Sequence, residues 1–541
     1  MSLYSIGLSG LNAAQSALST TSNNITNVYT EGYNRQLIQL GENGSGGALG
    51  SGVNVNGVQR QYNAYIGTQL NQANSREAAL ETYSQQISQI DDLLADGDSG
   101  LNTLMQKFFS SVEDLTGAPS DPAAREGMLG TSKSMVAQFR AYDTYLNDMR
   151  DGVNGQLESA VSQVNDLSEQ IAGLNKQVSL ARAKTGEEPN ALLDQRDNLV
   201  SQLNKVVDVK VAVQDGANYQ VSLGNGLPLV AGSQAFELAA VEGREDPTNL
   251  TVAYRNASGN LTQMEESVIQ GGEMGGMLGF RSETLDRVQN QLGQLSVSLA
   301  GSFNQQHRQG VDLEGNAGEA YFDLGSPTVF GDRQNAGTAS FSGRFDEPSE
   351  VTADDYRLTF QGGDRYQLEN LTSGDRSTVT AKDGKVAFAG VELTLKGTPS
   401  REDSFLVQPA RNAATGLDVA LSDTTKIAAA DGTNGGVGDN RNALALLDLQ
   451  NQKLVGGKAS FSGGFASMIS GVGNRAAITD ANLATQKGLG EQLYTYQQAD
   501  SGVNLDEEYA NLMRYQQYFA ANAKVIEAGT STLDTILGIR S

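Results

Sequence analysis

The sequence of 541 residues has no cysteine, no tryptophan and a single histidine, His307. Without cysteine, the chain cannot form disulfide bonds, cysteine nucleophiles, thiolate zinc sites or cysteine-bound iron–sulfur clusters. A single histidine excludes any site that needs two imidazoles. The nine prolines are few beside the 62 glycines. This composition favours long helices joined by glycine-rich loops over a proline-rich disordered chain.

Positive charge is also scarce, with 38 Lys and Arg against 63 Asp and Glu and a net charge of −25. A chain so acidic is expected to bind neither nucleic acid nor anionic lipid. No run approaches the roughly 18 to 20 apolar residues of a membrane-spanning helix, so no membrane insertion is expected. The first charged residue is Glu31 and the first positive one is Arg35, unlike a secretory signal. Export, if it occurs, is expected to use another route.

The motifs that resemble chemical sites each have a simpler interpretation. His307 is the only imidazole base, but no G-x-S-x-G nucleophile motif lies nearby, so a structural or surface role is expected. Residues 312–316 place glycine fourth rather than sixth, which favours a tight turn over a calcium loop. The paired glycines at 271–276 are not followed by the Lys-Ser or Lys-Thr of a phosphate loop. We therefore predict no catalytic residue, cofactor or metal site, and no enzyme.

Both ends of the chain carry an apolar stripe at heptad-like spacing, which is typical of helices that pack on other helices. The N-terminal stripe comprises Tyr4, Leu8, Leu11, Leu18 and Ile25, and the C-terminal one comprises Tyr509, Leu512, Phe519, Ala523, Ile526, Leu533 and Leu537. We predict that the two stripes pack on each other as a coiled-coil stem, or on their equivalents in neighbouring subunits. In the second case they would be the contacts of polymerisation. The alternative is that each stripe is the buried face of an ordinary surface helix.

The interior of the chain predicts a mixed, mainly α fold. Residues 60–205 read as long helices, and one continuous helix over 122–184 would span roughly 90 Å unless Gly152 and Gly155 kink it. A hairpin is expected around Asp215 and Gly216, and a helix over 277–307. Alternating residues predict a small all-β insertion. The expected division is a terminal stem (1–60 with 500–541), an elongated, mainly helical shaft with β elements (61–335 with 411–499) and a β-rich outer domain (336–410).

A signature near the N-terminus resembles that of the bacterial flagellar axial proteins, the rod, hook and hook-associated proteins. That signature reads S-x-N-N-I-A-N and then T-x-G-Y-x-R. The matching residues here are Asn23, Asn24, Ile25, Asn27, Thr30, Gly32, Tyr33 and Arg35, with Thr26 replacing the usual alanine. Residues 502–537 resemble the C-terminal end of the same family. The resemblance implies a homo-oligomer assembled in the flagellar axis.

Three central segments, at 192–197, 271–281 and 303–322, resemble the hook-associated protein 1 (FlgK-type) family. This resemblance implies a structural subunit that forms a ring at the hook–filament junction after type III export, outside the cell. Its implied partners are hook protein on one side, a second junction protein on the filament side and an export chaperone. A hook or rod protein of the same axial family is the alternative. The residues alone also leave a cell-envelope enzyme or an adhesin open.

Overall fold

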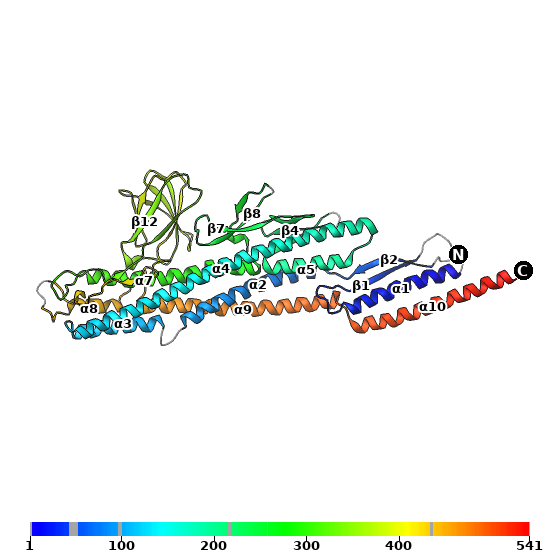
Figure 1. The fold of residues 1–541 in the computed structure, drawn as a ribbon, viewed down its shortest axis with the longest axis horizontal. Helices are drawn as coiled ribbons and strands as arrows, with labels where there is room; N and C mark the ends of the chain where they lie inside the picture. The colour runs from blue at the N-terminus through cyan, green and yellow to red at the C-terminus, as the bar shows by residue number, and fades with distance from the viewer. Residues whose placement is uncertain are drawn as a thin grey trace.

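The computed structural model describes residues 3–42, 52–95, 100–214, 218–256, 258–432 and 436–539, apart from the side chain of Leu537. The molecule is elongated, and its N- and C-termini lie together at one end (Figure 1). Helices dominate, accompanied by several small antiparallel sheets. The prediction of a mixed, mainly α fold is confirmed.

Long helices that lie side by side form the shaft (Figure 1). These are α2 (Ala64–Leu94), α3 (Leu101–Gly117), α4 (Pro122–Thr185), α5 (Asn190–Val206), α6 (Gly272–Phe280), α7 (Asp286–His307), α8 (Arg441–Asp448) and α9 (Phe461–Ser501). A π-helical turn, Arg281–Leu285, joins α6 to α7, so the helix expected over 277–307 is present with this one irregularity. Helices α2 and α9 come from opposite ends of the chain and pack against each other.

Helix α4 is continuous for 64 residues, or roughly 96 Å at the usual rise of 1.5 Å per residue. Asp121 caps its first turn with a side-chain bond to the Ala123 amide, and Pro122 occupies a position where no amide hydrogen is needed. The helix ends at Gly186, whose left-handed φ of 71° suits glycine. Gly152 and Gly155 do not interrupt it, and the predicted length of this helix is confirmed.

Large apolar side chains fill the shaft. At its far end Phe108, Phe303 and Phe322 are each at most 1% exposed, and their ring centroids lie 5.4 to 5.9 Å apart. His307 belongs to this cluster. Its Nε2 accepts a bond from the Ala428 amide at 2.9 Å, so Nδ1 carries the hydrogen and donates to the Glu319 carbonyl at 2.7 Å. Burial lowers the pKa of His307 to about 4. The residue is structural, one of the two roles predicted for it.

The acidic segment 312–316 and the paired glycines at 271–276 also have structural explanations. The Asp312 carboxylate accepts bonds from the amides of Glu314 and Asn316, at 2.9 and 2.8 Å, and Gly315 adopts a φ of 87°. The predicted tight turn is therefore confirmed. At Gly276, a Cβ atom would lie 2.4 Å from the Ala79 carbonyl oxygen, so this glycine lets α6 approach α2 closely.

Small sheets line one side of the shaft. They contain β3 (Val209–Val213), β4 (Tyr219–Leu223), β5 (Pro228–Ala231), β6 (Gln234–Ala235), β7 (Leu238–Glu242), β8 (Leu250–Arg255) and β9 (Leu261–Gln263), while β10 (Phe322–Asp323) pairs with β19 (Asp418–Val419). Strands β3 and β4 pair antiparallel, from Val209 opposite Leu223 to Val213 opposite Tyr219. The predicted hairpin is present, although Asp215 and Gly216 themselves lie outside the described residues.

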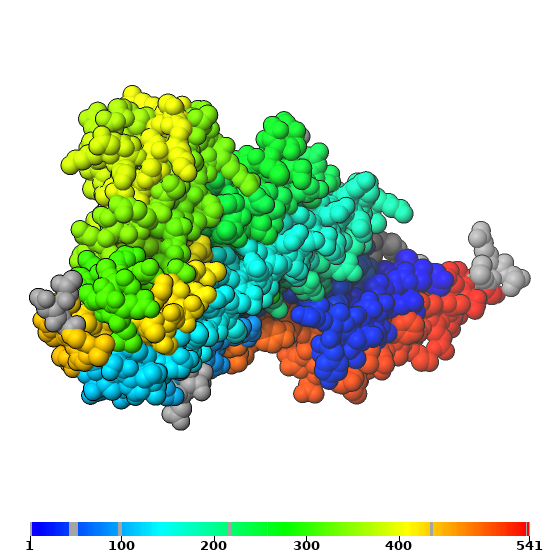
Figure 2. Space-filling view, turned by 60° about the vertical axis from the view of Figure 1, so that its left-hand side comes forward, coloured from blue at the N-terminus to red at the C-terminus, as the bar shows by residue number. Residues whose placement is uncertain are grey.

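Residues 328–408 form a β-rich body, here called the β-body, that projects from the shaft (Figures 1 and 2). It contains β11 (Thr328–Gly331), β12 (Ser340–Phe345), β13 (Tyr356–Gly362), β14 (Arg365–Asn370), β15 (Arg376–Thr380), β16 (Lys385–Phe388), β17 (Val391–Lys396) and β18 (Ser404–Gln408). One sheet has the order β11-β18-β13-β14-β15 and the other β12-β17-β16. Between them lies a separate apolar cluster that includes Leu358, Leu393 and Phe405.

Candidate functional site: the paired terminal helices and their joint with the shaft

Helix α1 (Leu3–Thr26) and helix α10 (Leu505–Gly538) run antiparallel, side by side, beyond the end of the shaft (Figures 1 and 2). A two-stranded ribbon, β1 (Gln36–Glu42) with β2 (Val53–Arg60), packs on α1. We call these three parts the stem. The chain thus leaves the stem after its first sixty residues and returns to it at its end.

The contact between the two stem helices is made of small residues. The buried residues of α1 are Gly7, Ala13, Ala14, Ala17, Thr20, Thr21 and Asn24. A Cβ atom on Gly7 would lie 2.8 Å from Cγ1 of Ile526, and one on Gly10 would lie 2.2 Å from Oδ1 of Asn522. A Cβ on Gly7 would also lie 3.2 Å from the Ile526 backbone nitrogen, so this position favours glycine unless α10 shifts, whereas at Gly10 the Asn522 side chain would have to move. Among the described residues of α10, only Glu508 and Gly529 are buried.

The predicted N-terminal stripe is not the face that α1 buries. Tyr4 and Leu8 are 44% and 41% exposed, while Leu11, Leu18 and Ile25 are half-buried. The expectation that the large apolar residues pair the two helices within one chain is therefore corrected. Close backbone approach at the small residues makes the pairing: Ile526 of the C-terminal stripe packs against Gly7, whereas Tyr4 and Leu8 stay largely exposed.

The C-terminal stripe is divided in the same way. Tyr509, Phe519, Ala523 and Leu533 are exposed, Leu512 and Ile526 are half-buried, and the side chain of Leu537 lies outside the described residues. A signal for the true contact face is present in the sequence. Small or polar residues recur at alternating steps of three and four through Gly7, Gly10, Ala14, Ala17, Thr21 and Asn24.

Asn24 is the centre of a polar joint where the stem meets the shaft. It is 1% exposed, and both the oxygen and the nitrogen of its side-chain amide form hydrogen bonds. Its Oδ1 accepts bonds from the Tyr33 hydroxyl at 2.8 Å and the Gln36 amide at 3.0 Å. Its Nδ2 donates to the Gln36 carbonyl at 2.9 Å and to Glu508 at 3.1 Å. This signature residue therefore ties the end of α1 to the segment that follows it and to the start of α10.

Arg35 makes the second link to α10. Its guanidinium donates to Glu508 at 2.8 Å and to Glu507 at 2.7 Å, and its backbone amide donates to the Ser501 carbonyl at 2.9 Å. The Glu508 side chain is 1% exposed. A buried carboxylate is costly unless it is paired and hydrogen-bonded, and Asn24 and Arg35 together supply both conditions here.

The joint continues into the shaft through α5. Asp194, which is 6% exposed, accepts bonds from Nδ2 of Asn34 at 2.7 Å and from Arg60 at 2.9 Å. Arg60 also donates to Asp197 at 2.6 Å. Burial raises the pKa of Asp194 above its ordinary value, against the opposing effect of these donors. Asn34 and Arg60 therefore bind the ribbon of the stem to helix α5 of the shaft.

The signature residues thus fall into two groups. Asn24, Tyr33 and Arg35 converge on the joint, where burial, together with Asp194 and Glu508, raises the pKa of Tyr33 to about 12 and keeps its hydroxyl a donor. The others shape the turn after α1: Asn23 and Asn27 bond to each other, Thr30 donates to Asn27, Gly32 has a φ of 77°, and Ile25 is half-buried.

Several residues of the joint were not predicted as site residues. They are Asn34, Arg60, Asp194, Asp197, Glu507 and Glu508. The described residues contain no group of three or more His, Asp or Glu that could hold a metal ion. In the same part of the chain, every helix is too short or too polar to cross a membrane. The arrangement fixes two long helices to the shaft.

Four family models match successive parts of the chain. A model described as the flagellar hook-associated protein FlgK helical domain matches residues 87–322, and one described as the D2-like domain of flagellar hook-associated protein 1 matches residues 330–409. The ends match models described as flagella basal body rod protein, at residues 5–34, and flagellar basal body rod FlgEFG protein C-terminal, at residues 498–539.

Whole-length relatives and a solved structure agree with these matches. The chain is 44% identical over 546 residues to flagellar hook-associated protein 1 of Escherichia coli strain K12, covering 100% of both chains. It is 24% identical to the protein of that name from Bacillus subtilis, over 97% of this chain and 96% of the relative. The flagellar hook junction protein FlgK from Burkholderia pseudomallei superposes with a TM-score of 0.75 and 27% identity, covering 80% of this chain and 99% of that one.

Proposed function

Because this chain belongs to the flagellar hook-associated protein 1 family and is a structural component of the hook–filament junction, we propose that its stem is the part that assembles into the flagellar axis. Copies of the chain would pack stem to stem in a ring. The observation that supports this is the outward position of the large apolar residues on both stem helices. Leu8 and Leu533 are 41% and 46% exposed, although residues of this type are usually buried.

The stem has little apolar core of its own. Its internal contact is built from glycine, alanine and threonine, which bury little apolar area. Tyr509, Met513 and Tyr518 add further exposed apolar surface along α10. Apolar surface that stays exposed in a soluble chain is typical of protein–protein contact sites. Neighbouring stems would cover it and would supply the packing that two helices alone lack.

The remaining roles follow from this arrangement. The neighbours in the axis would be hook protein on one side and a second junction protein on the filament side. The chain would reach this position outside the cell by type III export, escorted by a chaperone. Residues 1–60 with 500–541 would form the axial domain and the β-body an outer domain, with the shaft between them. The boundary expected at residue 336 is moved to 328, because β11 (Thr328–Gly331) pairs with β18 in a sheet of the β-body. In this role the protein would be a structural subunit without catalytic activity.

The test is to place a charge on the stripe by the substitution Leu533→Asp. Burying an unpaired carboxylate between helices costs several kcal/mol, on the order of 3, at every subunit of the ring. Cells that make this variant should form hooks, lack filaments and release filament protein into the medium. Electron microscopy and measurement of filament protein in the medium report these outcomes.

Gln517→Asp is the matched control, because it adds the same charge to an exposed position of α10 that lies off the stripe. These cells should keep their filaments. Normal filaments on the Leu533→Asp cells, with the variant present at the junction, would show that the stripe is not an assembly contact.

A further inference from the structure

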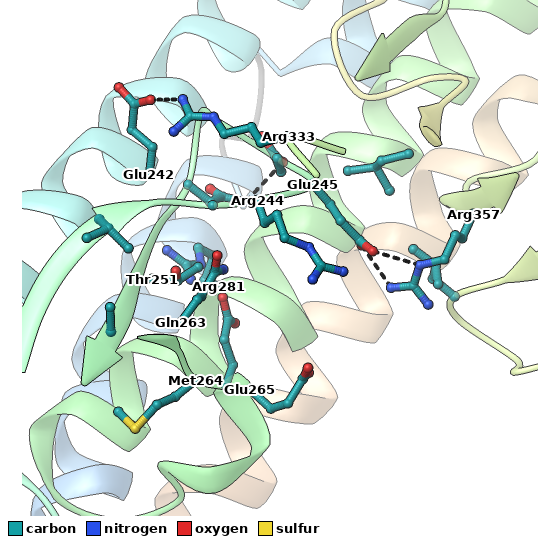
Figure 3. A pocket seen from close by; sticks show the side chains of 18 of the residues that line it. Glu242, Arg244, Glu245, Thr251, Gln263, Met264, Glu265, Arg281, Arg333 and Arg357 are labelled. Atoms are coloured by element: carbon teal, nitrogen blue, oxygen red, sulfur yellow. Dashed lines mark hydrogen bonds and ion pairs between the residues drawn. The ribbon is translucent and has the colours of Figure 1, made fainter. Parts of the chain in front are cut away.

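A cleft of about 900 Å³ separates the β-body from the sheet of β7, β8 and β9. Charged side chains cross its rim (Figure 3). On the shaft side they come from residues 242–246, at the end of β7 and the start of its connection to β8; we call this segment the clasp. Facing it, the β-body presents Asp332, Arg333 and Arg357.

Three ion pairs join the clasp to the β-body. Glu242 pairs with Arg333, and Nε of Arg244 lies 2.8 Å from Oδ2 of Asp332. Arg357 donates two parallel bonds to the carboxylate of Glu245, at 2.9 and 2.8 Å. A bidentate pair of this kind fixes direction as well as distance. These pairs therefore set the angle between the two surfaces.

The third carboxylate of the segment, Asp246, reaches a buried cluster at the neck of the β-body. Arg411 is 3% exposed at its centre, with Asp286 at 3.0 Å and Asp246 at 3.7 Å, and it is also paired with Asp355. Gln408, the last residue of β18, donates to Asp246 at 3.0 Å. Residues from the clasp, from the first turn of α7 and from the β-body thus share one guanidinium.

The segment that follows the clasp is anchored to the shaft, and the clasp bonds to that segment through the Gly243 amide, which donates to the Asn249 carbonyl at 2.8 Å. Asn154 of α4 donates to the Thr248 carbonyl at 2.9 Å and accepts from the Leu250 amide at 2.9 Å. Arg281, 1% exposed, donates to the Leu250 carbonyl at 2.8 Å. The clasp therefore connects the longest helix of the shaft to the β-body without belonging to either.

A second attachment of the β-body is apolar and lies on α7. Val297 of α7 belongs to the apolar cluster of the β-body together with Val351. Pro348 lies so close to α7 that a Cβ on Gly301 would be 2.4 Å from it. Apolar contacts persist at high salt, whereas ion pairs between partly exposed groups are screened. The exposed pairs of the clasp therefore weaken at high ionic strength, whereas the apolar contact and the buried Arg411 cluster persist.

We propose that the clasp is a conformational latch: the ion pairs of Glu242, Arg244 and Glu245 fix the angle at which the β-body projects. Their loss lets the β-body tilt about its root, which is formed by the apolar contact on α7 and the buried Arg411 cluster. The cleft provides space for this movement. The stem and α4 would keep their positions, so the β-body would change its direction relative to the shaft. The latch rests on contacts of the shaft and β-body only, and it does not depend on the proposed assembly through the stem.

The test measures the distance between the shaft and the β-body in the full-length monomer. Because the chain has no cysteine, Ser162→Cys on α4 and Ser377→Cys on β15 supply two unique labelling sites, both exposed. Spin labels there should give one narrow distance distribution at about 0.05 M salt, and a broader, shifted one at about 1 M salt, where the screening length falls to roughly 3 Å.

Charge-reversal variants give a second measure. Glu245→Arg places two guanidinium groups in opposition and should broaden the distribution even at low salt. Adding Arg357→Glu restores an opposite pair and should narrow it again. Arg344→Glu is the control, because it breaks an exposed pair with Glu392 inside the β-body and should leave the distance unchanged.

Hydrogen exchange at Leu358 and Leu393 monitors the fold of the β-body in every sample. A broadened distribution with these amides still protected supports the latch. An unchanged distribution in the wild-type chain at high salt overturns it, and so does broadening that appears only together with loss of this protection.

Discussion

The shaft and the stem are both built of long helices, but they are held together by different means. In the shaft Phe108, Phe139, Phe280 and Phe303 are each at most 1% exposed. Burial of one such side chain contributes about 1.5 to 3 kcal/mol, so the shaft carries its own stability. The stem buries glycine and alanine, and α10 buries only Glu508 and Gly529 among its described residues. A helix pair of this kind depends on its joint and, in the proposed assembly, on neighbouring stems.

Leucine-to-alanine substitutions should show this contrast most strongly. Leu157 in α4 is 0% exposed, and its truncation leaves a cavity, so Leu157→Ala should lower the free energy of unfolding by about 2 to 5 kcal/mol. Leu8→Ala, at a position 41% exposed in the stem, should change it by less than about 0.5 kcal/mol. Urea unfolding of the two variants measures both values. Equal losses would mean that stem and shaft unfold as one cooperative unit with one core.

A substitution in the joint should give the next largest loss of stability, and the loss should be confined to the stem. Arg35→Ala leaves the buried Glu508 carboxylate with Asn24 as its donor, which should cost roughly 3 kcal/mol. Hydrogen exchange should accelerate at the start of α10 and at the end of α1, while the amides of α4 keep their protection. The control is Arg514→Ala, whose guanidinium bonds to Asn511 on the surface of α10. Acceleration throughout the shaft in Arg35→Ala would contradict a joint that holds only the stem.

The long elements were predictable from the sequence because their signals are strong and local. The apolar spacing of α4 runs through Val153, Leu157 and Val161, and all three side chains are buried. The hairpin of β13 and β14 carries glycines at its turn: Gly362 ends β13 and Gly363 follows it, and both have positive φ, of 106° and 64°.

The stem contact and the joint were harder to predict, for two physical reasons. Apolar spacing identifies a face that avoids water, but it does not say whether the partner is the same chain or another copy. Leu8 belongs to that face, whereas Gly7 beside it makes the contact within the chain. The joint depends on pairs such as Arg35 with Glu508, which are 473 positions apart. One sequence contains no information that selects this carboxylate among the 63 Asp and Glu.

Acidification should change the stability contributed by two buried groups, His307 and Asp355, in opposite directions. Burial lowers the pKa of His307 to about 4, whereas an unfolded histidine titrates near about 6.5. Between these values the unfolded chain binds more protons, so acidification destabilises this end of the shaft, by about 2 kcal/mol at pH about 5. Burial raises the pKa of Asp355 to about 6, so between about pH 4 and 6 its folded form binds more protons and acidification stabilises the β-body locally.

Hydrogen exchange at pH about 7 and pH about 5, corrected for the intrinsic exchange rate, separates these two responses. Protection should fall around His307 and rise around Asp355. The His307→Gln and Asp355→Asn variants each remove one titration and should flatten the corresponding response. A response of the same sign in both regions, or one that persists in these variants, would contradict the assignment.

Two helical glycines should show the smallest effect and the same contrast. Gly130 lies on the exposed side of α4 with nothing within 4 Å of an added Cβ, so Gly130→Ala should stabilise the shaft by about 0.4 to 1 kcal/mol through its helix propensity. Gly7→Ala makes the same chemical change in α1, but its Cβ would lie 2.8 Å from Cγ1 of Ile526 and 3.2 Å from the Ile526 backbone nitrogen. It should leave urea unfolding of the shaft unchanged and increase the rate at which protease cleaves the stem. If Gly7→Ala instead protected the stem as Gly130→Ala stabilises the shaft, then helix propensity rather than close backbone approach would hold α1 against α10.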